Sequence, residues 1–311
     1  MKWQGVIPAI TTPFKPDFSV DADLLVKQVD ALVRAGCAGV VALGSLGEGG
    51  SLSFDEKKAV LRLCREALAG RAPLVAGVAA LTTAEAMRLA ELGAEAGCEG
   101  LMVLPPYVYQ GDWRESRAYF AAVIGETPLP CMLDNNPVGY GTDVRPEQMV
   151  DLAVSLPNLV AVKESSAEVR RVTSLRTLLG DRLAILVGVD DLVLEGVQAG
   201  AVGWVAGLAD ALPAESVRLF DLAAAGRIAE ARALYDWFLP LLRLDTVPKF
   251  VQLIKLVQQE TGLGSETVRA PRLPLEAPER EAVVGLVRYA LARRPPPGGD
   301  PPPLGGEAGR G

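Results

Sequence analysis

Short apolar runs alternate along the chain with longer segments in which apolar residues recur every three or four positions. Such runs, bounded by glycine, proline or polar residues, are typical of strands, and the three-to-four spacing is typical of amphipathic helices. The runs are apolar at successive positions, so we expect strands buried on both faces, as in a parallel sheet. The expected strands lie near residues 5–11, 39–44, 73–79, 100–105, 130–135, 159–165, 183–188 and 203–207.

Eight apolar strands separated by helices predict an α/β fold, and eight is the number of parallel strands that closes a (β/α)₈ TIM barrel. A repeated phrase supports this prediction at Ala35–Gly39, Ala96–Gly100 and Ala199–Gly203. In each copy one glycine follows a helical pattern, where a left-handed residue commonly ends a helix, and a second glycine precedes an apolar run. The first two copies begin 61 residues apart, which matches two βα units.

We expect three regions: the barrel over 1–225, a helical extension over 226–294, and a tail over 295–311. The tail is rich in proline and glycine and cannot bury apolar area, so it is predicted to be disordered. The helices of the extension need a surface to pack on, either the side of the barrel or another subunit. They are expected over 228–243, 247–261 and 277–292.

Composition and charge exclude several classes of protein. Half of the residues are hydrophobic and 22% are charged, so a large core is available. The net charge of −7 and the scattered Lys and Arg residues argue against a nucleic-acid surface. The N-terminus lacks the apolar core of a signal peptide, and no apolar stretch reaches the ~18 residues of a membrane span. We therefore expect a cytoplasmic protein.

The chain has no histidine, and its four cysteines form no CxxC pair. A zinc site built on Cys and His spacing and a histidine-dependent catalytic triad are therefore disfavoured. We expect no metal and no cofactor, so the chemistry must use Lys, Asp, Glu, Tyr, Ser or backbone groups. The cysteines are interpreted as reduced core residues: Cys37, Cys64, Cys98 and Cys131.

Lys163 ends the apolar run at 159–165 and is the strongest candidate for chemistry. Reactive groups of a (β/α)₈ barrel gather at the C-terminal ends of the strands. A lysine there loses hydration, and an unprotonated amine is a nucleophile toward a carbonyl carbon. The alternative is a lysine that only caps a strand end in solvent.

Polar groups end three other expected strands. The turn Gly44–Gly47 offers backbone N–H groups and the hydroxyl of Ser45 to a carboxylate. Two tyrosines, Tyr107 and Tyr109, follow strand four, and Asp134 ends strand five. We expect these tyrosines and this acid to converge on the lysine.

Four motifs, taken in order, resemble the dihydrodipicolinate synthase/N-acetylneuraminate lyase superfamily over about residues 1–293: Gly44–Glu48, Asp134–Pro137, Val162–Ser166 and Gly188–Asp191. The resemblance implies a (β/α)₈ barrel with extra C-terminal helices, usually assembled as a homotetramer. It also implies that Lys163 binds a 2-keto acid as a Schiff base.

Other stretches resemble the family of Δ1-pyrroline-4-hydroxy-2-carboxylate deaminases, which release 2-oxoglutarate semialdehyde and ammonia. These stretches are Asn135–Tyr140, Gly203–Gly207, Leu234–Leu242 and Arg269–Leu273. The resemblance places Gly139 where synthases carry the arginine that binds the second substrate's carboxylate. Glycine cannot form that ion pair, so the synthase reaction is disfavoured.

The sequence departs from the family pattern at two positions. The resemblance places Asp134 at the family's proton-shuttling tyrosine and Leu46 at the second threonine of the turn. Asp134 can carry protons if burial raises its pKa, but an ionised carboxylate beside Lys163 would favour the ammonium and weaken catalysis. Both interpretations stay open, with Tyr140 and Tyr109 as candidate replacements for the tyrosine.

The leading hypothesis is a cofactor-free Schiff-base lyase or deaminase that acts on a small 2-keto acid or cyclic imine. The alternatives are 4-hydroxy-tetrahydrodipicolinate synthase or another pyruvate-dependent aldolase, and a keto-acid-binding protein with weakened catalysis. The expected catalytic residues are Lys163, Asp134 and Ser45. The expected substrate contacts are Gly44, Leu46, Gly47, Tyr109, Asn136, Tyr140 and Val205.

Overall fold

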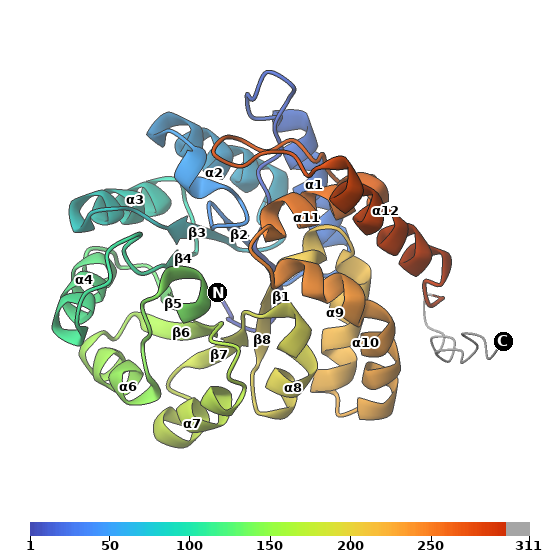
Figure 1. Cartoon of the computed structure of the whole chain (residues 1–311). Helices are drawn as coiled ribbons and strands as arrows, with labels where there is room; N and C mark the ends of the chain where they lie inside the picture. The colour runs from blue at the N-terminus through green and yellow to red at the C-terminus, as the bar shows by residue number, and fades with distance from the viewer. Residues whose placement is uncertain (297–311) are drawn as a thin grey trace.

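The computed structural model describes residues 1–296, and its centre is one eight-stranded parallel sheet (Figure 1). Its strand order is β1-β8-β7-β6-β5-β4-β3-β2, and a bridge between Ala9 and Val41 joins the first strand to the last. The sheet is thereby a barrel, which confirms the predicted (β/α)₈ fold. The strands are β1 (Gly5–Pro8), β2 (Val40–Ala42), β3 (Leu74–Val78), β4 (Gly100–Val103), β5 (Cys131–Asn135), β6 (Leu159–Glu164), β7 (Ala184–Val187) and β8 (Gly203–Ala206).

Helices surround the strands in Figure 1, as the spacing of apolar residues predicts. Their starts are well capped: Ser53 and Glu56 form a reciprocal capping box, and Thr82 accepts a hydrogen bond from the N–H of Glu85. No helix of residues 1–296 is long and apolar enough to cross a membrane. The helices around the barrel are α1 (Ala22–Arg34), α2 (Phe54–Leu68), α3 (Thr83–Glu95), α4 (Trp113–Gly125), α5 (Pro137–Tyr140), α6 (Pro146–Ser155), α7 (Arg170–Leu179), α8 (Val193–Gln198) and α9 (Pro213–Ala224).

The strands are shorter than the sequence predicts, mostly at their C-terminal ends. Beyond β1, the N–H of Thr11 donates to the side chain of Asp210 at 2.9 Å instead of to a neighbouring strand. Beyond β2, Leu43 has a φ of +67°, which turns the chain out of the extended conformation. The predicted ends at residues 11 and 44 are therefore wrong, because the chain turns there to build loops at the barrel mouth.

Residues inside the barrel form a core separate from the core between strands and helices. Along β6, Ala161 belongs to the inner core and Val162 to the outer core. Side chains alternate between the faces of a strand, so Lys163 follows Ala161 into the barrel. The inner core is formed by Trp3, Ile7, Val41, Val75, Ala79, Met102, Leu104, Met132, Ala161, Leu186 and Val205.

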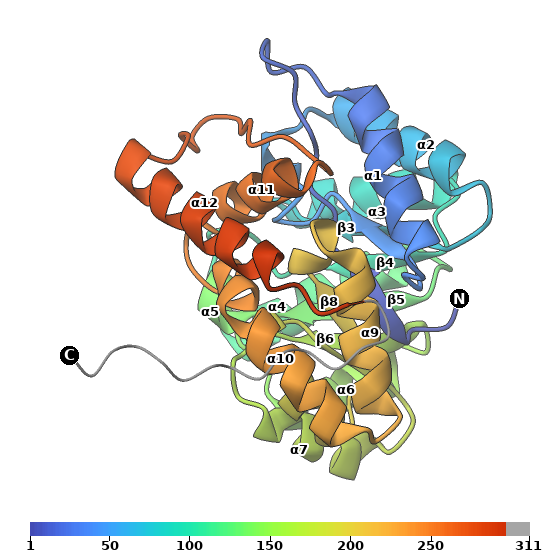
Figure 2. The same ribbon diagram turned by 90° about the vertical axis from the view of Figure 1, so that its right-hand side faces the viewer.

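The helical extension packs on one side of the barrel, where α10 lies beside α9 and α12 packs on α10 and α11 (Figures 1 and 2). The indole N–H of Trp237 on α10 donates to the carbonyl of Ala290 on α12 at 3.0 Å. The sequence allowed a packing surface on the barrel or on another subunit, and the barrel side covers these helices. The extension comprises α10 (Ile228–Leu242), α11 (Phe250–Thr261) and α12 (Ala277–Ala292).

Two details of this region differ from prediction or lie beyond the structure. Helix α11 begins at Phe250 rather than at residue 247, because Pro248 disfavours a helical conformation at the residue before it. Apart from Pro295 and Pro296, the tail predicted to be disordered lies outside the described residues.

All four cysteines are buried and free. Burial raises the pKa of the Cys64 thiol to about 12, which makes its reactive thiolate scarce at neutral pH. Their interpretation as reduced core residues agrees with this placement.

Candidate active site

Lys163 lies on β6 between Asp134 of β5 and Leu186 of β7, which are its partners in the sheet. Its Nζ donates a hydrogen bond to Oδ2 of Asp134 at 3.2 Å. Only 12% of the lysine side chain is exposed. Gly188 makes room for it, because a Cβ at that position would lie 2.7 Å from Cε of Lys163. The amine is thus held at the barrel mouth by a hydrogen bond to Asp134.

Asp134 is 1% exposed, and its Oδ1 has no hydrogen-bond partner among the described residues. Burial raises the pKa of this carboxyl, and the charge of Lys163 opposes the rise only in part. A carboxyl with a raised pKa can accept a proton from the lysine and return it later. If the proton resides on Asp134, Lys163 is a free amine and Asp134 acts as the proton carrier. If it resides on Lys163, the carboxylate holds the lysine as an unreactive ammonium.

Ser45 joins two tyrosine hydroxyls. Its Oγ lies 2.5 Å from the hydroxyl oxygen of Tyr140 and 3.1 Å from that of Tyr107. The two rings meet edge to face with centroids 5.7 Å apart. Burial raises the pKa of both tyrosines, so their hydroxyls stay protonated and can donate. The result is a chain of three hydroxyls near Asp134, whose charge contributes to both tyrosine shifts.

The turn that carries Ser45 is held rigidly. Gly44 lies against Met102, and a Cβ at Gly47 would lie 2.8 Å from the carbonyl oxygen of Ile10, so the backbones approach too closely for a larger residue. Glu48 follows with a φ of +53° and is fixed by an ion pair with Lys255. This fixed backbone sets the direction of the serine hydroxyl.

The loop after β5 begins with Asn136, which caps α5. Its Oδ1 accepts the N–H of Gly139 at 2.9 Å, and the helix carries Tyr140 back to Ser45. A Cβ at Gly139 would lie 3.0 Å from Nδ2 of Asn136, so a larger residue would displace that cap. Asn136 therefore shapes the loop, and its direct contact with substrate stays a prediction.

The side chains of two predicted substrate contacts, Tyr109 and Leu46, lie outside the inner core of the barrel. Tyr109 is 54% exposed and lines an open cavity of about 450 Å³ with Leu81 and Glu115. Leu46 is buried in the outer core, because its position in the turn directs it away from the barrel interior. Val205, by contrast, belongs to the inner core of the barrel, on the side of the strands that Lys163 also faces. In place of Tyr109, Tyr107 reaches Ser45.

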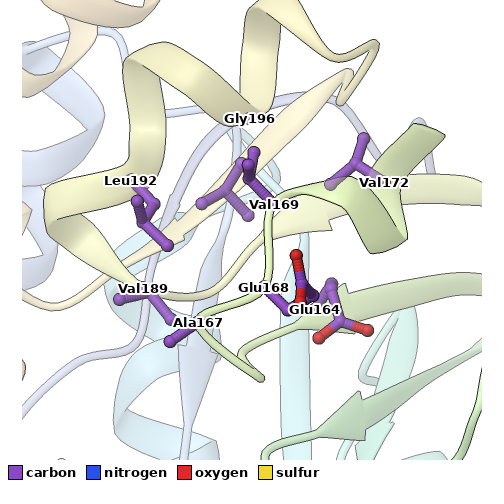
Figure 3. A pocket seen from close by; sticks show the side chains of 9 residues that line it. Glu164, Ala167, Glu168, Val169, Val172, Val189, Leu192 and Gly196 are labelled. Atoms are coloured by element: carbon purple, nitrogen blue, oxygen red, sulfur yellow. The ribbon is translucent and has the colours of Figure 1, made fainter.

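Glu164 follows Lys163 but faces the opposite side of β6. Its carboxylate accepts hydrogen bonds from Nδ2 of Asn135 at 3.0 Å and from the N–H of Ser166 at 2.8 Å. Figure 3 shows it beside a small cavity of about 20 Å³ with Ala167 and Glu168. This cavity lies outside the barrel, so it does not belong to the lysine site.

Two acids near Lys163 were missed in the sequence. Asp190 follows β7 and accepts hydrogen bonds from the indole of Trp204 and from the N–H groups of Gly207 and Leu208. Burial raises its pKa to about 6. Asp245 follows α10 and lies against Gly207. The motif Gly188–Asp191 contained a signal for the first acid, whereas no motif marked the second.

The geometry of the site can be compared with known proteins. A profile of the Dihydrodipicolinate synthetase family matches residues 2–290. The chain belongs to this family. The 4-hydroxy-tetrahydrodipicolinate synthase of Rhizobium meliloti (strain 1021) is 34% identical, over 93% of this chain and 98% of the relative. The synthase of Xanthomonas axonopodis pv. citri (strain 306) is 35% identical, over 94% of this chain and 96% of the relative.

Solved structures of the family have the same fold. Dihydrodipicolinate synthase from Aquifex aeolicus superposes with a TM-score of 0.88 at 26% identity, over 92% of this chain and 98% of that chain. A family member from an E. coli K12 prophage, in complex with pyruvate, gives a TM-score of 0.88 at 27% identity over 94% and 99% of the two chains.

The predicted superfamily is confirmed, and with it a lyase of the Schiff-base type. The curated relatives above bear the synthase name, and these comparisons do not point to the deaminase.

Proposed function

We propose that this chain is a Schiff-base lyase in which Lys163 attacks C2 of a cyclic imine, Δ1-pyrroline-4-hydroxy-2-carboxylate. The observation that carries the Schiff-base role is the 3.2 Å contact between Nζ of Lys163 and Asp134 inside the barrel mouth. Two features support the choice of substrate. Gly139 offers no guanidinium to a second carboxylate, and several stretches of sequence resemble the deaminases.

The proposed reaction consumes one water in total and releases one ammonia. Asp134 takes a proton from Lys163, whose Nζ then bonds to C2. The bond between C2 and the ring nitrogen breaks, which leaves an iminium on Lys163 and an amine on C5. A proton leaves C3 and the hydroxyl leaves C4 as water. Proton transfers from C5 and its nitrogen to C3 and C4 then convert the amine to an imine. One water hydrolyses this imine to the C5 aldehyde and ammonia, and a second water releases 2-oxoglutarate semialdehyde from the lysine.

A second candidate is 4-hydroxy-tetrahydrodipicolinate synthase, favoured by the names of the relatives at 34% and 35% identity. It would use Lys163 in the same way, with pyruvate as the bound keto acid. It would also need a cation for the carboxylate of aspartate semialdehyde, and Gly139 removes the one that the family pattern supplies. We therefore rank the synthase second.

The test combines covalent trapping with product analysis. The full chain is reduced with borohydride in the presence of pyruvate, and intact-mass and peptide analysis locate the adduct. Ammonia release is then measured with the pyrroline substrate, and condensation with pyruvate plus aspartate semialdehyde. An adduct on Lys163 with ammonia release supports the deaminase, and condensation alone would establish the synthase. Trapping without either turnover would identify a keto-acid-binding protein.

We also propose that the chain forms a homotetramer, as the family resemblance implies. The extension already packs on the barrel, so its apolar faces are no longer the reason. Exposed apolar side chains instead follow β3 and β4, where Leu81 is 63% and Val108 89% exposed. Light scattering at micromolar concentration should give about four times the chain mass of 32.8 kDa. The mass of a single chain would contradict this proposal.

A further inference from the structure

Asp245 ends the 3₁₀ turn Arg243–Asp245, which connects α10 to α11. Its carboxyl group lies directly on Gly207, the residue that follows β8. A Cβ at Gly207 would lie 2.2 Å from Oδ1 and 2.7 Å from Oδ2 of Asp245. The helical extension therefore places an acid at the mouth of the barrel, where only glycine leaves space for it.

The carboxyl group of Asp245 is incompletely satisfied. Its Oδ1 is inaccessible and has no hydrogen-bond partner among residues 1–296. A buried acceptor without a donor costs about 1–3 kcal/mol, and such groups in native proteins call for an explanation. Asp190, by contrast, accepts three hydrogen bonds that fix the turn at Gly207. Asp190 thus holds the surface on which Asp245 lies.

Asp245 shares its surroundings with the reactive groups. Burial raises its pKa well above the usual value; the charge of Asp190 adds to the rise, and the charge of Lys163 opposes it. The charge of Asp245 in turn contributes to the raised pKa of Tyr140. An acceptor without a donor therefore lies close to both the lysine and the hydroxyl chain.

We propose that Asp245 is a specificity-determining residue that accepts a hydrogen bond from a hydroxyl or amino group on the part of the substrate remote from C2. This inference rests on the proposed function, in which Lys163 binds C2. A substrate with a second carboxylate would instead bring a further negative charge toward the two buried acids Asp190 and Asp245, and the pKa of about 6 leaves Asp190 ionised at neutral pH. The site therefore selects keto acids and cyclic imines with a remote donor over dicarboxylates.

The test uses three probes that present the same keto group to Lys163. Pyruvate has no remote group, 4-hydroxy-2-oxopentanoate has a hydroxyl, and 2-oxoglutarate has a carboxylate. The concentration that gives half-maximal borohydride trapping is measured for each. An unsatisfied buried acceptor costs about 1–3 kcal/mol, so the hydroxy acid that satisfies it should trap at a concentration roughly 5- to 150-fold below that of pyruvate. The dicarboxylate should require the highest concentration.

Two substitutions separate charge from hydrogen bonding. Asp245→Asn keeps an acceptor but removes the ionisable carboxyl group, so a few-fold preference for the hydroxy acid should remain and 2-oxoglutarate should improve. Asp245→Leu should remove the preference altogether. Gly207→Ala, which pushes the carboxyl group away without removing it, should also reduce the preference. Asp236→Asn makes the same substitution at a partly exposed position on α10 and should leave the trapping concentrations of all three probes unchanged.

Pyruvate has no remote group, so its trapping reports on Lys163 alone and separates a failure of the Asp245 inference from a failure of the proposed function. If the Asp245 variants leave the half-maximal trapping concentrations of all three probes unchanged, or shift them equally, Asp245 does not set specificity and the inference is overturned. If the native protein traps none of the three probes on Lys163, the proposed function itself fails, and this inference fails with it.

Discussion

Two buried lysine–carboxylate pairs of residues 1–296 are in very different states: Lys163–Asp134 inside the barrel, and Lys255–Glu48 between α11 and the barrel. In the first pair Nζ makes one hydrogen bond, at 3.2 Å, and one carboxyl oxygen is left without a partner. In the second pair Nζ lies 2.5 Å from Oε1 of Glu48 and also donates to the carbonyl of Thr267.

The second pair is satisfied on every side. The other oxygen of Glu48 accepts the N–H of Arg269 at 3.0 Å, and Nζ of Lys255 lies 4.4 Å from the centroid of the Phe14 ring. Both charged side chains are fully buried. Burial lowers the pKa of Lys255 to about 8, although Glu48 opposes the change.

The difference indicates which lysine can react. Every polar atom of the Lys255 pair is used to hold the Ser45 turn against α11, so this pair stabilises structure. The Lys163 pair leaves an oxygen and an amine available at the barrel mouth, where a substrate can complete their hydrogen bonds. Burial of a lysine alone does not identify a nucleophile, whereas incomplete pairing at a strand end does.

The largest expected effect is the loss of covalent trapping in Lys163→Ala. Without its amine the site cannot form a Schiff base, so borohydride with pyruvate should leave no adduct in the intact-mass spectrum. Lys58→Ala, which removes an exposed lysine of α2, should trap as the native chain does. An adduct that persists in Lys163→Ala would show that another lysine is the nucleophile.

The sequence alone predicts the strands and the position of Lys163, because apolar runs specify the strands and the strand period places Lys163 inside the barrel. Its partner Asp134 followed from the end of β5. The choice between Tyr107 and Tyr109 was not accessible: Val108 has a φ of +70°, and this turn directs one tyrosine inward and leaves the other in solvent. Asp245 was missed because only the packing of α10 on α9 brings it to the site.

Asp134→Asn should slow trapping and turnover by about 10²–10⁴-fold, the usual size of general acid–base catalysis. The amide cannot take the lysine's proton, although it nearly preserves the shape of the side chain. The rate of adduct formation measures this, with the thermal midpoint as a check on folding. If Asp134→Asn or Asp134→Tyr instead reacts faster than the native chain, the carboxylate is restraining the lysine, and the interpretation of a weakened enzyme is correct.

Lys255→Met should lower the free energy of unfolding by about 3–5 kcal/mol, because Glu48 would keep a buried charge without its main partner. Adding Glu48→Gln should recover part of the loss, since the charge is then removed as well. Denaturant titration of the single and double variants measures both effects. Lys163→Met should cost less, because the raised pKa of Asp134 lets it take up a proton. Equal losses at the two lysines would contradict the distinction between the pairs.

Asp190 is a third buried acid, hydrogen-bonded but without an ion-pair partner among residues 1–296. The pH dependence of stability tests how it differs from the two paired acids. Its pKa rises from 3.8 to about 6 in the folded chain. The folded state therefore holds a proton that the unfolded state has lost between those values, so stability from this group is present below about pH 4 and declines as pH rises through 6. The contribution of Asp190 to the free energy of unfolding should thus fall by about 3 kcal/mol between pH 4 and neutral pH.

Urea unfolding of the native chain and of Asp190→Asn, measured between pH 4 and pH 7, isolates this contribution. The amide can still accept from Trp204 and Gly207, but its NH₂ group would face the N–H of Leu208, so the variant starts with lower stability at every pH. Only the difference between the two chains is diagnostic, because the titration of all other groups is common to both. That difference should narrow as pH rises. A difference that stays constant from pH 4 to pH 7 would mean that the three hydrogen bonds keep Asp190 ionised throughout, and that a buried acid needs no cation to remain charged in this barrel.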